Sequence, residues 1–91
     1  MKTILLTGDS RGLGNSIVKV LLKNDYRVIG ISRTKTNEVN QLLKDYGEKK
    51  FIHINFDLSN VEEIKNLYKT KIKPLTRENG IYGFVNNAAS A

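Results

Sequence analysis

The sequence predicts an α/β fold in which four parallel strands lie in the spatial order 3-2-1-4, with helices on both faces of the sheet. Short apolar runs alternate along the chain with segments whose apolar residues recur at helical spacing. Each pair of successive runs is separated by one such segment, and parallel strands need a crossover of this kind. The chain has 91 residues, so one domain over residues 1–91 is expected.

Four apolar runs mark the expected strands. The first is Ile4-Leu5-Leu6, which is followed closely by a glycine. The others are expected at residues 28–31, 51–56 and 81–85. The first two runs are continuously apolar, which is typical of strands that are buried on both faces of a parallel sheet.

The first two intervening segments have clear ends. Apolar residues recur at helical spacing over residues 17–22, and this helix is expected to end near Asn24. A weaker helix contains Leu42 and should end near Gly47, because glycine is favoured just past a helix.

The third helix is expected to begin at a capping box and to end near a proline. Ser59-Asn60-Val61-Glu62 has Ser followed three residues later by Glu, which predicts Ser59 as the N-cap. Pro74 lacks the N–H that a helix interior requires, so the helix should kink or end there.

Composition excludes several classes of function. The formal charge is +6, but Lys and Arg are scattered from Lys2 to Arg77, so no nucleic-acid partner is expected. Only three consecutive residues near the N-terminus are apolar, too few for a signal peptide or a membrane helix, so no membrane partner is expected. The sequence has no Cys, which excludes disulfides and thiolate metal sites and fits a reducing, cytoplasmic location.

The fourth strand is expected at an edge of the sheet. Its residues Ile81, Phe84 and Val85 are apolar, and an uncharged apolar edge is a template for another strand. The sequence ends at Ala91, shortly after this strand. We therefore expect a C-terminally truncated fold whose open edge favours self-association.

The segment Thr7-Gly8-Asp9-Ser10-Arg11-Gly12-Leu13-Gly14 joins the first strand to the first helix. Gly8 allows a sharp exit from the strand, Gly12 allows backbone to approach a pyrophosphate, and Gly14 allows helix and strand to pack closely. The free N–H groups and positive end of the helix would face the phosphates. The segment predicts a dinucleotide site, in which we include Ser10, Arg11 and Leu13.

The glycines allow two other interpretations. A plain tight turn between strand and helix stays open as the alternative, although three glycines within seven residues disfavour it. A phosphate-binding loop of nucleoside triphosphatases needs Lys and then Ser or Thr after its last glycine. Asn15 and Ser16 follow Gly14 here, which argues against that loop.

The glycine spacing Gly-x-x-x-Gly-x-Gly, with Thr7 before it and Asn86-Asn87-Ala88-Ala89 after the fourth strand, resembles the short-chain dehydrogenase/reductase family. The 3-oxoacyl-carrier-protein reductases and related sugar or polyol dehydrogenases are the members it resembles most. The resemblance covers the whole chain and implies one half of a Rossmann-like fold. Ala89 is a departure, because the family has Gly at that position.

The resemblance also implies roles for single residues. The three glycines of the loop would line the pyrophosphate. Asp57, after the third strand, would bind the adenine amino group, and Leu58 would lie against the ring. Asn86 and Ala88 would lie beside the adenine ribose. Two alternatives stay open: Asp57 as a cap of the next helix, and Asn86 as a residue that only joins strands.

Ser32 and Arg33, at the end of the second strand, predict which cofactor binds. An acidic residue there binds the ribose 2′-hydroxyl, whereas Arg accepts a 2′-phosphate. Ser32 stands where the family has its acidic residue, and Arg33 lies 19 residues past Gly14, near the expected distance. Arg11 is a second cation that could reach the same phosphate. NADP(H) is therefore predicted over NAD(H), with a solvated surface role for Arg33 as the alternative.

The family's reaction is hydride transfer between a nicotinamide cofactor and a carbonyl or alcohol substrate. Its catalytic Ser and Tyr-x-x-x-Lys come from elements beyond the fourth strand. We therefore expect the NADP(H)-binding portion of an oxidoreductase, without turnover by itself and with a small-molecule substrate only in a complete enzyme. A stand-alone dinucleotide-binding or interaction module without catalysis is the alternative.

Four further residues could suggest chemistry but are expected to be structural. Tyr46 and Lys50 lie four apart, but Gly47 interrupts the helix between them. His53, the only histidine, lies between two isoleucines with no visible nucleophile or metal cluster. Asp9 is expected to be a turn residue.

Overall fold

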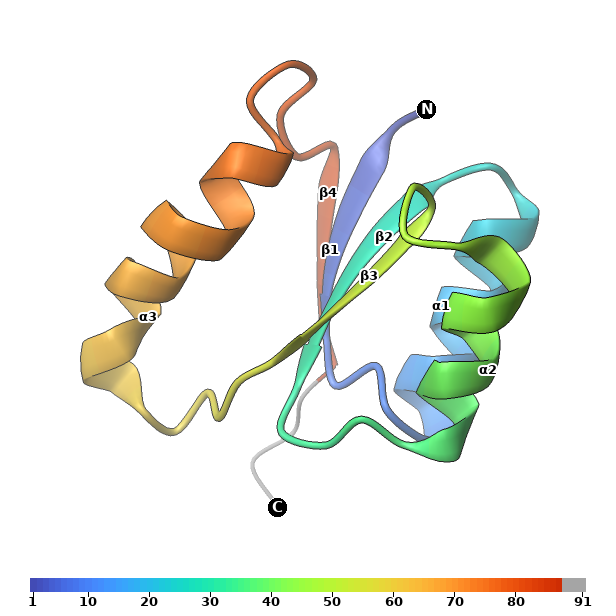
Figure 1. Cartoon of the computed structure of the whole chain (residues 1–91), viewed down its shortest axis with the longest axis horizontal. Coiled ribbons are helices and arrows are strands. Elements are labelled where there is room, and N and C mark those ends of the chain that lie inside the picture. The colour runs from blue at the N-terminus through green and yellow to red at the C-terminus, as the bar shows by residue number, and fades with distance from the viewer. Residues whose placement is uncertain (88–91) are drawn as a thin grey trace.

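The computed structural model describes residues 1–87, and its sheet has the predicted topology (Figure 1). Four parallel strands lie in the order β3-β2-β1-β4. Their bounds are Thr3–Thr7 for β1, Arg27–Ser32 for β2, Phe51–Asn55 for β3 and Gly83–Asn86 for β4. Each bound lies within two residues of the sequence prediction, so apolar runs located every strand.

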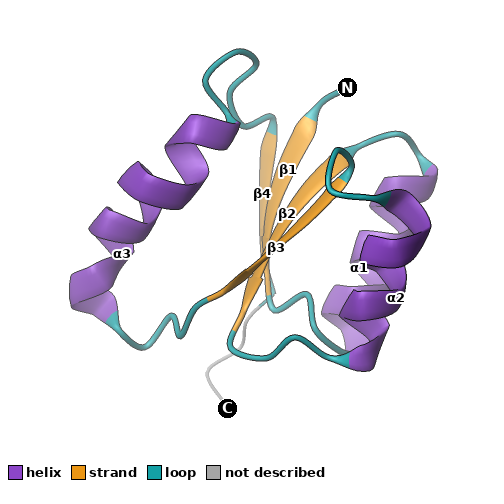
Figure 2. Cartoon of the chain, viewed as in Figure 1, coloured by secondary structure: helices purple, strands orange, loops and turns teal. Residues whose placement is uncertain are grey.

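Helices cover both faces of the sheet, as predicted. α1 (Gly12–Lys23) and α2 (Asn37–Tyr46) lie on one face, and α3 (Val61–Leu67) lies on the other (Figure 2). The chain after α3 continues in a π turn over Tyr68–Ile72 and a 3-10 turn over Lys73–Leu75. The helical segment therefore ends at the proline, as the missing N–H of Pro74 requires.

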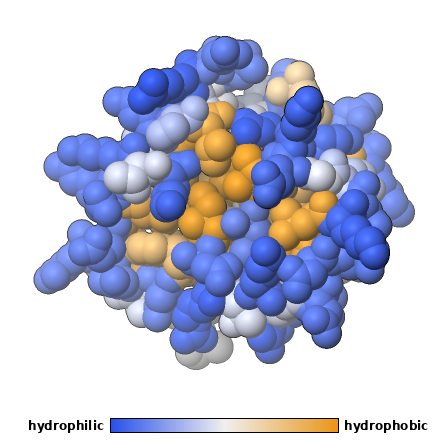
Figure 3. All heavy atoms as spheres, viewed as in Figure 1, coloured by the Kyte–Doolittle hydropathy of each residue, from blue (hydrophilic) through white to orange (hydrophobic). Residues whose placement is uncertain are grey.

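Two apolar clusters hold these layers together. The cluster between the sheet and the α1–α2 pair consists of Leu6, Val18, Leu22, Val28, Val39, Leu42 and Phe51. The smaller cluster under α3 contains Ile31, Leu67 and Ile72, with Leu5, Ile54, Phe56 and Leu58 packed against it. Figure 3 shows apolar side chains gathered between α3 and the α1–α2 pair, surrounded by hydrophilic ones. Hydrophobic burial on both faces thus fixes the strands whose ends form the site.

The predicted capping box at the third helix is wrong. The N-cap of α3 is Asn60, and its side chain makes no capping hydrogen bond. The Ser59 hydroxyl instead donates to Asp57 Oδ1 at 2.7 Å. Ser59 is therefore part of the turn that precedes α3, and the helix begins one residue later than expected.

Candidate functional site

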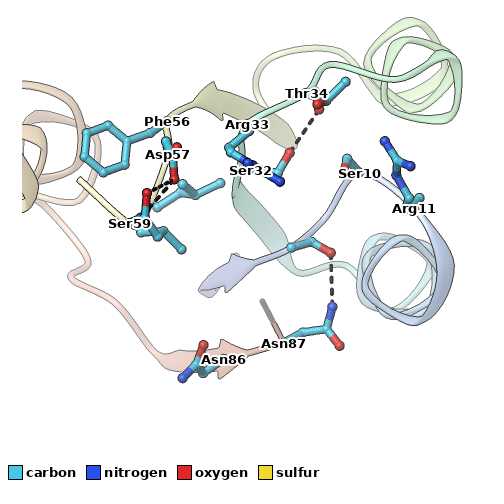
Figure 4. Close-up of a pocket in the computed structure, with 13 residues that line it drawn as sticks. Ser10, Arg11, Ser32, Arg33, Thr34, Phe56, Asp57, Ser59, Asn86 and Asn87 are labelled. Atoms are coloured by element: carbon cyan, nitrogen blue, oxygen red, sulfur yellow. Dashed lines mark hydrogen bonds between the residues drawn. The ribbon is translucent and has the colours of Figure 1, made fainter. Parts of the chain in front are cut away.

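An open cleft of about 810 Å³ lies at the carboxyl ends of the strands. This is where open parallel α/β sheets bind their ligands. Figure 4 shows its walls: Ser10 and Arg11 on one side, Asp57 and Ser59 opposite, and Asn86 and Asn87 at and just after the end of β4. The lining residues are Gly8, Ser10, Arg11, Ile31, Ser32, Arg33, Thr34, Phe56, Asp57, Leu58, Ser59, Asn86 and Asn87.

Most predicted site residues meet at this cleft. Those that line it are Gly8, Ser10, Arg11, Ser32, Arg33, Asp57, Leu58 and Asn86. Gly12, Leu13 and Gly14 begin α1 and are not among the lining residues, and Ala88 lies outside the described part of the chain. Sequence reasoning missed five lining residues, because nothing in the glycine motif marks the neighbouring strand ends: Ile31, Thr34, Phe56, Ser59 and Asn87.

Gly14 explains why the loop needs a glycine that does not face the cleft. A Cβ built on Gly14 would lie 1.7 Å from the carbonyl oxygen of Gly8, which no side chain can occupy. Gly8 and Gly12 have φ of 77° and 58°, in the left-handed region that glycine adopts easily. Leu13 is 69% exposed and points away from the core. The close strand–helix packing expected of Gly14 is therefore present.

Backbone and side-chain hydrogen bonds fix the glycine-rich loop. The Gly8 N–H donates to the Ile31 carbonyl at 2.8 Å, which ties the loop to β2. Asn15 Nδ2 donates to the Asp9 carbonyl at 3.2 Å, and Thr36 Oγ1 donates to the Ser10 carbonyl at 2.5 Å. The loop is thus held by β2, by α1 and by the residue that begins α2.

A hydrogen-bond network joins the loop to the end of β4. Thr7 Oγ1 donates to Asn86 Oδ1 at 3.0 Å and accepts from the Asn87 N–H at 3.1 Å. Asn87 Nδ2 donates to the Gly8 carbonyl at 3.1 Å. Asn86 therefore does join strands, through its side chain, and it also borders the cleft.

The end of β2 brings two polar residues to the cleft and no carboxylate. Ser32 Oγ donates to the Thr34 carbonyl at 3.0 Å, which shapes the turn after the strand. Arg33 is exposed, and within residues 1–87 its guanidinium forms no salt bridge. Arg33 therefore brings a positive charge to the cleft.

Asp57 lies across the cleft and is partly engaged by its own chain. Its Oδ1 accepts hydrogen bonds from the Ser59 hydroxyl at 2.7 Å and the Ser59 N–H at 2.9 Å. These bonds, with the charge of Arg33, hold the pKa of the Asp57 carboxyl below its usual value. Asp57 is therefore an anion that supports the turn before α3, but it does not cap that helix, whose N-cap is Asn60.

Asp9 and His53 form a buried pair behind the loop. The distance between Asp9 Oδ2 and His53 Nδ1 is 2.6 Å, and the two side chains are 0% and 1% exposed. His53 was predicted to be structural, and Asp9 is the residue with which it pairs. Asp9 is more than the turn residue expected from the sequence, because its carboxylate is buried rather than solvated.

Tyr46 and Lys50 lie at the opposite end of the sheet from the cleft, beside the start of β3. Lys50 Nζ lies 5.4 Å from the centre of the Tyr46 ring and donates to the Leu22 carbonyl at 3.2 Å. Neither residue lines the cleft.

Comparison with known proteins agrees with this geometry. Residues 2–91 match the family model for short chain dehydrogenases. The chain belongs to the short-chain dehydrogenase family. The family resemblance drawn from the glycine spacing is thereby confirmed, whereas the finer likeness to 3-oxoacyl-carrier-protein reductases stays a prediction.

Three relatives show how much of a family member this chain represents. Benzil reductase ((S)-benzoin forming) of Bacillus cereus is 31% identical over 99% of this chain and 36% of its own length. The short-chain dehydrogenase/reductase YIR035C of Saccharomyces cerevisiae is 33% identical, with a TM-score of 0.73, over 97% of this chain and 34% of that one. A Burkholderia multivorans short-chain dehydrogenase/reductase with bound NADP is 30% identical, with a TM-score of 0.67, over 75% and 30% of the two chains. The chain spans about a third of the length of these relatives.

No helix within residues 1–87 is both long enough and apolar enough to cross a membrane.

Proposed function

We propose that this chain is the NADP(H)-binding portion of an oxidoreductase that transfers hydride between a nicotinamide cofactor and a carbonyl or alcohol substrate. The observation that carries the proposal is the cleft, which joins the glycine-rich loop to a β2 end that carries Ser32 and Arg33. The ligand surface of a dinucleotide is anionic, and two guanidinium groups, Arg11 and Arg33, border this cleft. The shape and charge of the cleft therefore favour a dinucleotide.

Each part of the cofactor has residues of matching chemistry. The start of α1 offers N–H groups for the pyrophosphate, and its first turn contains no acidic residue. Arg33 would hold the 2′-phosphate, with Arg11 as the second cation. Asp57 and Leu58 would contact the adenine, and Asn86 would lie near the ribose. When bound, the cofactor supplies the hydride, while these residues bind and orient it.

The preference for NADP(H) rests on this chain's own residues. Solved structures similar to this chain include a short-chain dehydrogenase/reductase with bound NADP and a 4-hydroxyisoleucine dehydrogenase complexed with NADH. The absence of a carboxylate at Ser32 removes the usual partner of an unphosphorylated ribose. Arg33 supplies a planar donor group that matches a phosphate.

A carbonyl compound is the proposed substrate class of the complete enzyme, because curated relatives are named as benzil reductases. The described residues that line this cleft contain no Tyr-x-x-x-Lys, the catalytic pattern that the family uses with a Ser. We therefore propose binding without turnover for this chain alone. A cytoplasmic location is likewise proposed, on the reducing setting that a Cys-free sequence fits.

Titration of the purified chain with NADPH and with NADH tests the proposal. We expect NADPH to bind about tenfold more tightly, because a charge-assisted contact to the 2′-phosphate is lost with NADH. Arg33→Asp should remove or reverse this preference, while Arg77→Asp, a surface arginine outside the cleft, should leave it unchanged. An unchanged preference in Arg33→Asp would refute the cofactor assignment, and failure of both dinucleotides to bind would refute the site.

A further inference from the structure

The buried Asp9–His53 pair is not required by the fold in any obvious way. Besides the contact between Oδ2 and Nδ1, the second carboxylate oxygen of Asp9 and Nε2 of His53 are buried without a hydrogen-bond partner among residues 1–87. Leaving polar atoms buried and unpaired is unfavourable. A pair of apolar side chains of similar volume would commonly be as stable or more so. Stability alone therefore does not account for this pair.

The pair links the glycine-rich loop to β3 across β2. Asp9 belongs to the glycine-rich loop, and His53 belongs to β3, two strands away from β1. Gly30 of β2 lies between them, in register with Leu6 on one side and His53 on the other. A Cβ at Gly30 would come within 2.0 Å of Asp9 Oδ2. The absent side chain at Gly30 leaves the room through which the Asp9 carboxylate reaches across β2 to β3.

The loop residues next to Asp9 are those that face the cleft. Ser10 and Arg11 line it, while the Asp9 side chain points the other way, into the protein. The main-chain contacts of the loop reach β2, α1 and the start of α2, whereas among residues 1–87 a hydrogen bond from the loop to β3 is made by the Asp9 side chain alone. The pair thus connects the phosphate side of the cleft to the strand that is followed by the adenine-side residues Asp57 and Leu58.

We propose that Asp9 and His53 are positioning residues that fix the glycine-rich loop so that Ser10 and Arg11 meet the cofactor. This inference rests on the proposed dinucleotide function. The pair acts through the loop backbone and touches no ligand itself, because both side chains are buried. The pair holds the loop in one conformation before the cofactor binds. Binding therefore costs less conformational entropy.

Two variants of His53 test whether its hydrogen bond to Asp9, rather than the volume of its side chain, positions the loop. In His53→Asn the side-chain amide nitrogen falls near the place of Nδ1 and can still donate to Asp9. In His53→Gln the amide nitrogen falls near the place of Nε2, beyond the carboxylate. We expect the Asn variant to bind NADPH within about twofold of the wild type and the Gln variant to bind about tenfold more weakly, which is the effect of one hydrogen bond. Equal affinities for the two variants would overturn the proposal.

A double variant separates an effect on NADPH binding from an effect on the stability of the fold. Asp9→Ala combined with His53→Leu leaves no unpaired buried group, so its urea midpoint should lie near that of the wild type. If the pair positions the loop, the double variant still binds NADPH about tenfold more weakly. If it binds with wild-type affinity, the pair is only structural and the proposal fails. Asp25→Ala, which removes a carboxylate from the surface contact with Lys50, is the matched control and should leave Kd unchanged.

Hydrogen exchange of the free chain distinguishes this inference from the proposed function. The Ser10 and Arg11 amides should exchange faster in the double variant than in the wild type, at equal global stability. That result would support loop positioning even if the wild type bound no dinucleotide, in which case only the proposed function would fail. Unchanged exchange at both amides would refute the positioning role whatever the cofactor does.

Discussion

Asp57 illustrates, at the scale of one residue, how a candidate ligand also serves the fold. Two hydrogen bonds from Ser59 end on its Oδ1, which fixes the carboxylate at the edge of the cleft. The same bonds favour the charged form, and Arg33 adds to the effect, so the pKa of Asp57 is lowered. A lowered pKa in the folded state means that ionised Asp57 stabilises folding above the unfolded-state pKa of about 3.9. This stabilisation is lost as the pH falls through the folded-state pKa.

Removing the serine hydroxyl should therefore raise the pKa of Asp57. In Ser59→Ala the side-chain donor, the largest cause of the shift, is gone, while the backbone N–H bond remains. We expect the titration midpoint of the Asp57 carboxyl carbon, followed by NMR, to move toward its ordinary value without reaching it. Ser59→Thr keeps a hydroxyl and is the control. A midpoint that stays where it is in Ser59→Ala would show that the hydroxyl does not set this pKa.

Local sequence predicted some residues of the site and could not predict others. Gly14 was predictable because its constraint, contact with the Gly8 carbonyl, arises within one turn between strand and helix. The Asp9–His53 pair was not, because its members are 44 residues apart and only the sheet order brings them together. His53 was expected to be structural from its apolar neighbours, but its partner could be identified only in three dimensions.

At the scale of elements, the start of α2 is coupled to the glycine-rich loop through Thr36. Its Oγ1 accepts from the Val39 N–H at 3.3 Å and so caps the helix, and the same hydroxyl donates to the Ser10 carbonyl at 2.5 Å. One hydroxyl therefore satisfies a helix N–H that has no partner within the helix and holds a residue of the cleft.

Thr36→Val should test this coupling, since it keeps the shape of the side chain and removes the hydroxyl. We expect a loss of about 1 kcal/mol in the free energy of unfolding in urea, the usual value of an N-cap. NADPH affinity should fall as well, because the Ser10 carbonyl loses its donor. Thr36→Ser retains the hydroxyl and should behave like the wild type. Full affinity in Thr36→Val, despite lower stability, would show that cap and loop are independent.

The elements themselves were predictable because periodicity and breakers act locally. The apolar runs located all four strands, and Gly47 and Pro74 marked where helical segments end. The capping box at Ser59 failed for a different reason: Ser59 lies in a turn closed by Asp57, whose Oδ1 accepts from both the Ser59 hydroxyl and the Ser59 N–H, and the N-cap is Asn60. Turn geometry decides which neighbouring polar group a side chain binds. A short sequence motif does not specify that geometry.

At the scale of the whole molecule, the edge of the sheet at β4 exposes large apolar side chains. Within residues 1–87, β4 pairs only with β1. Tyr82 and Phe84 are 59% and 58% exposed, and Phe84 lies in register with Leu5, which packs on the α3 side of the sheet. An apolar strand edge with free main-chain groups is a template for another strand. Nothing on this edge carries a charge that would oppose pairing, because β4 consists of Gly83-Phe84-Val85-Asn86.

We therefore predict that the chain self-associates through β4, with a second copy covering the edge. Sedimentation velocity at rising protein concentration should show species heavier than the 10.3 kDa monomer. Phe84→Lys should shift the distribution to monomer, since a charge at a strand edge opposes edge-to-edge pairing. Val20→Lys places the same charge on the exposed side of α1, at a residue that is 59% exposed, and should leave association unchanged. A wild type that stays monomeric, or a Val20→Lys variant that dissociates equally well, would place the contact elsewhere or exclude it.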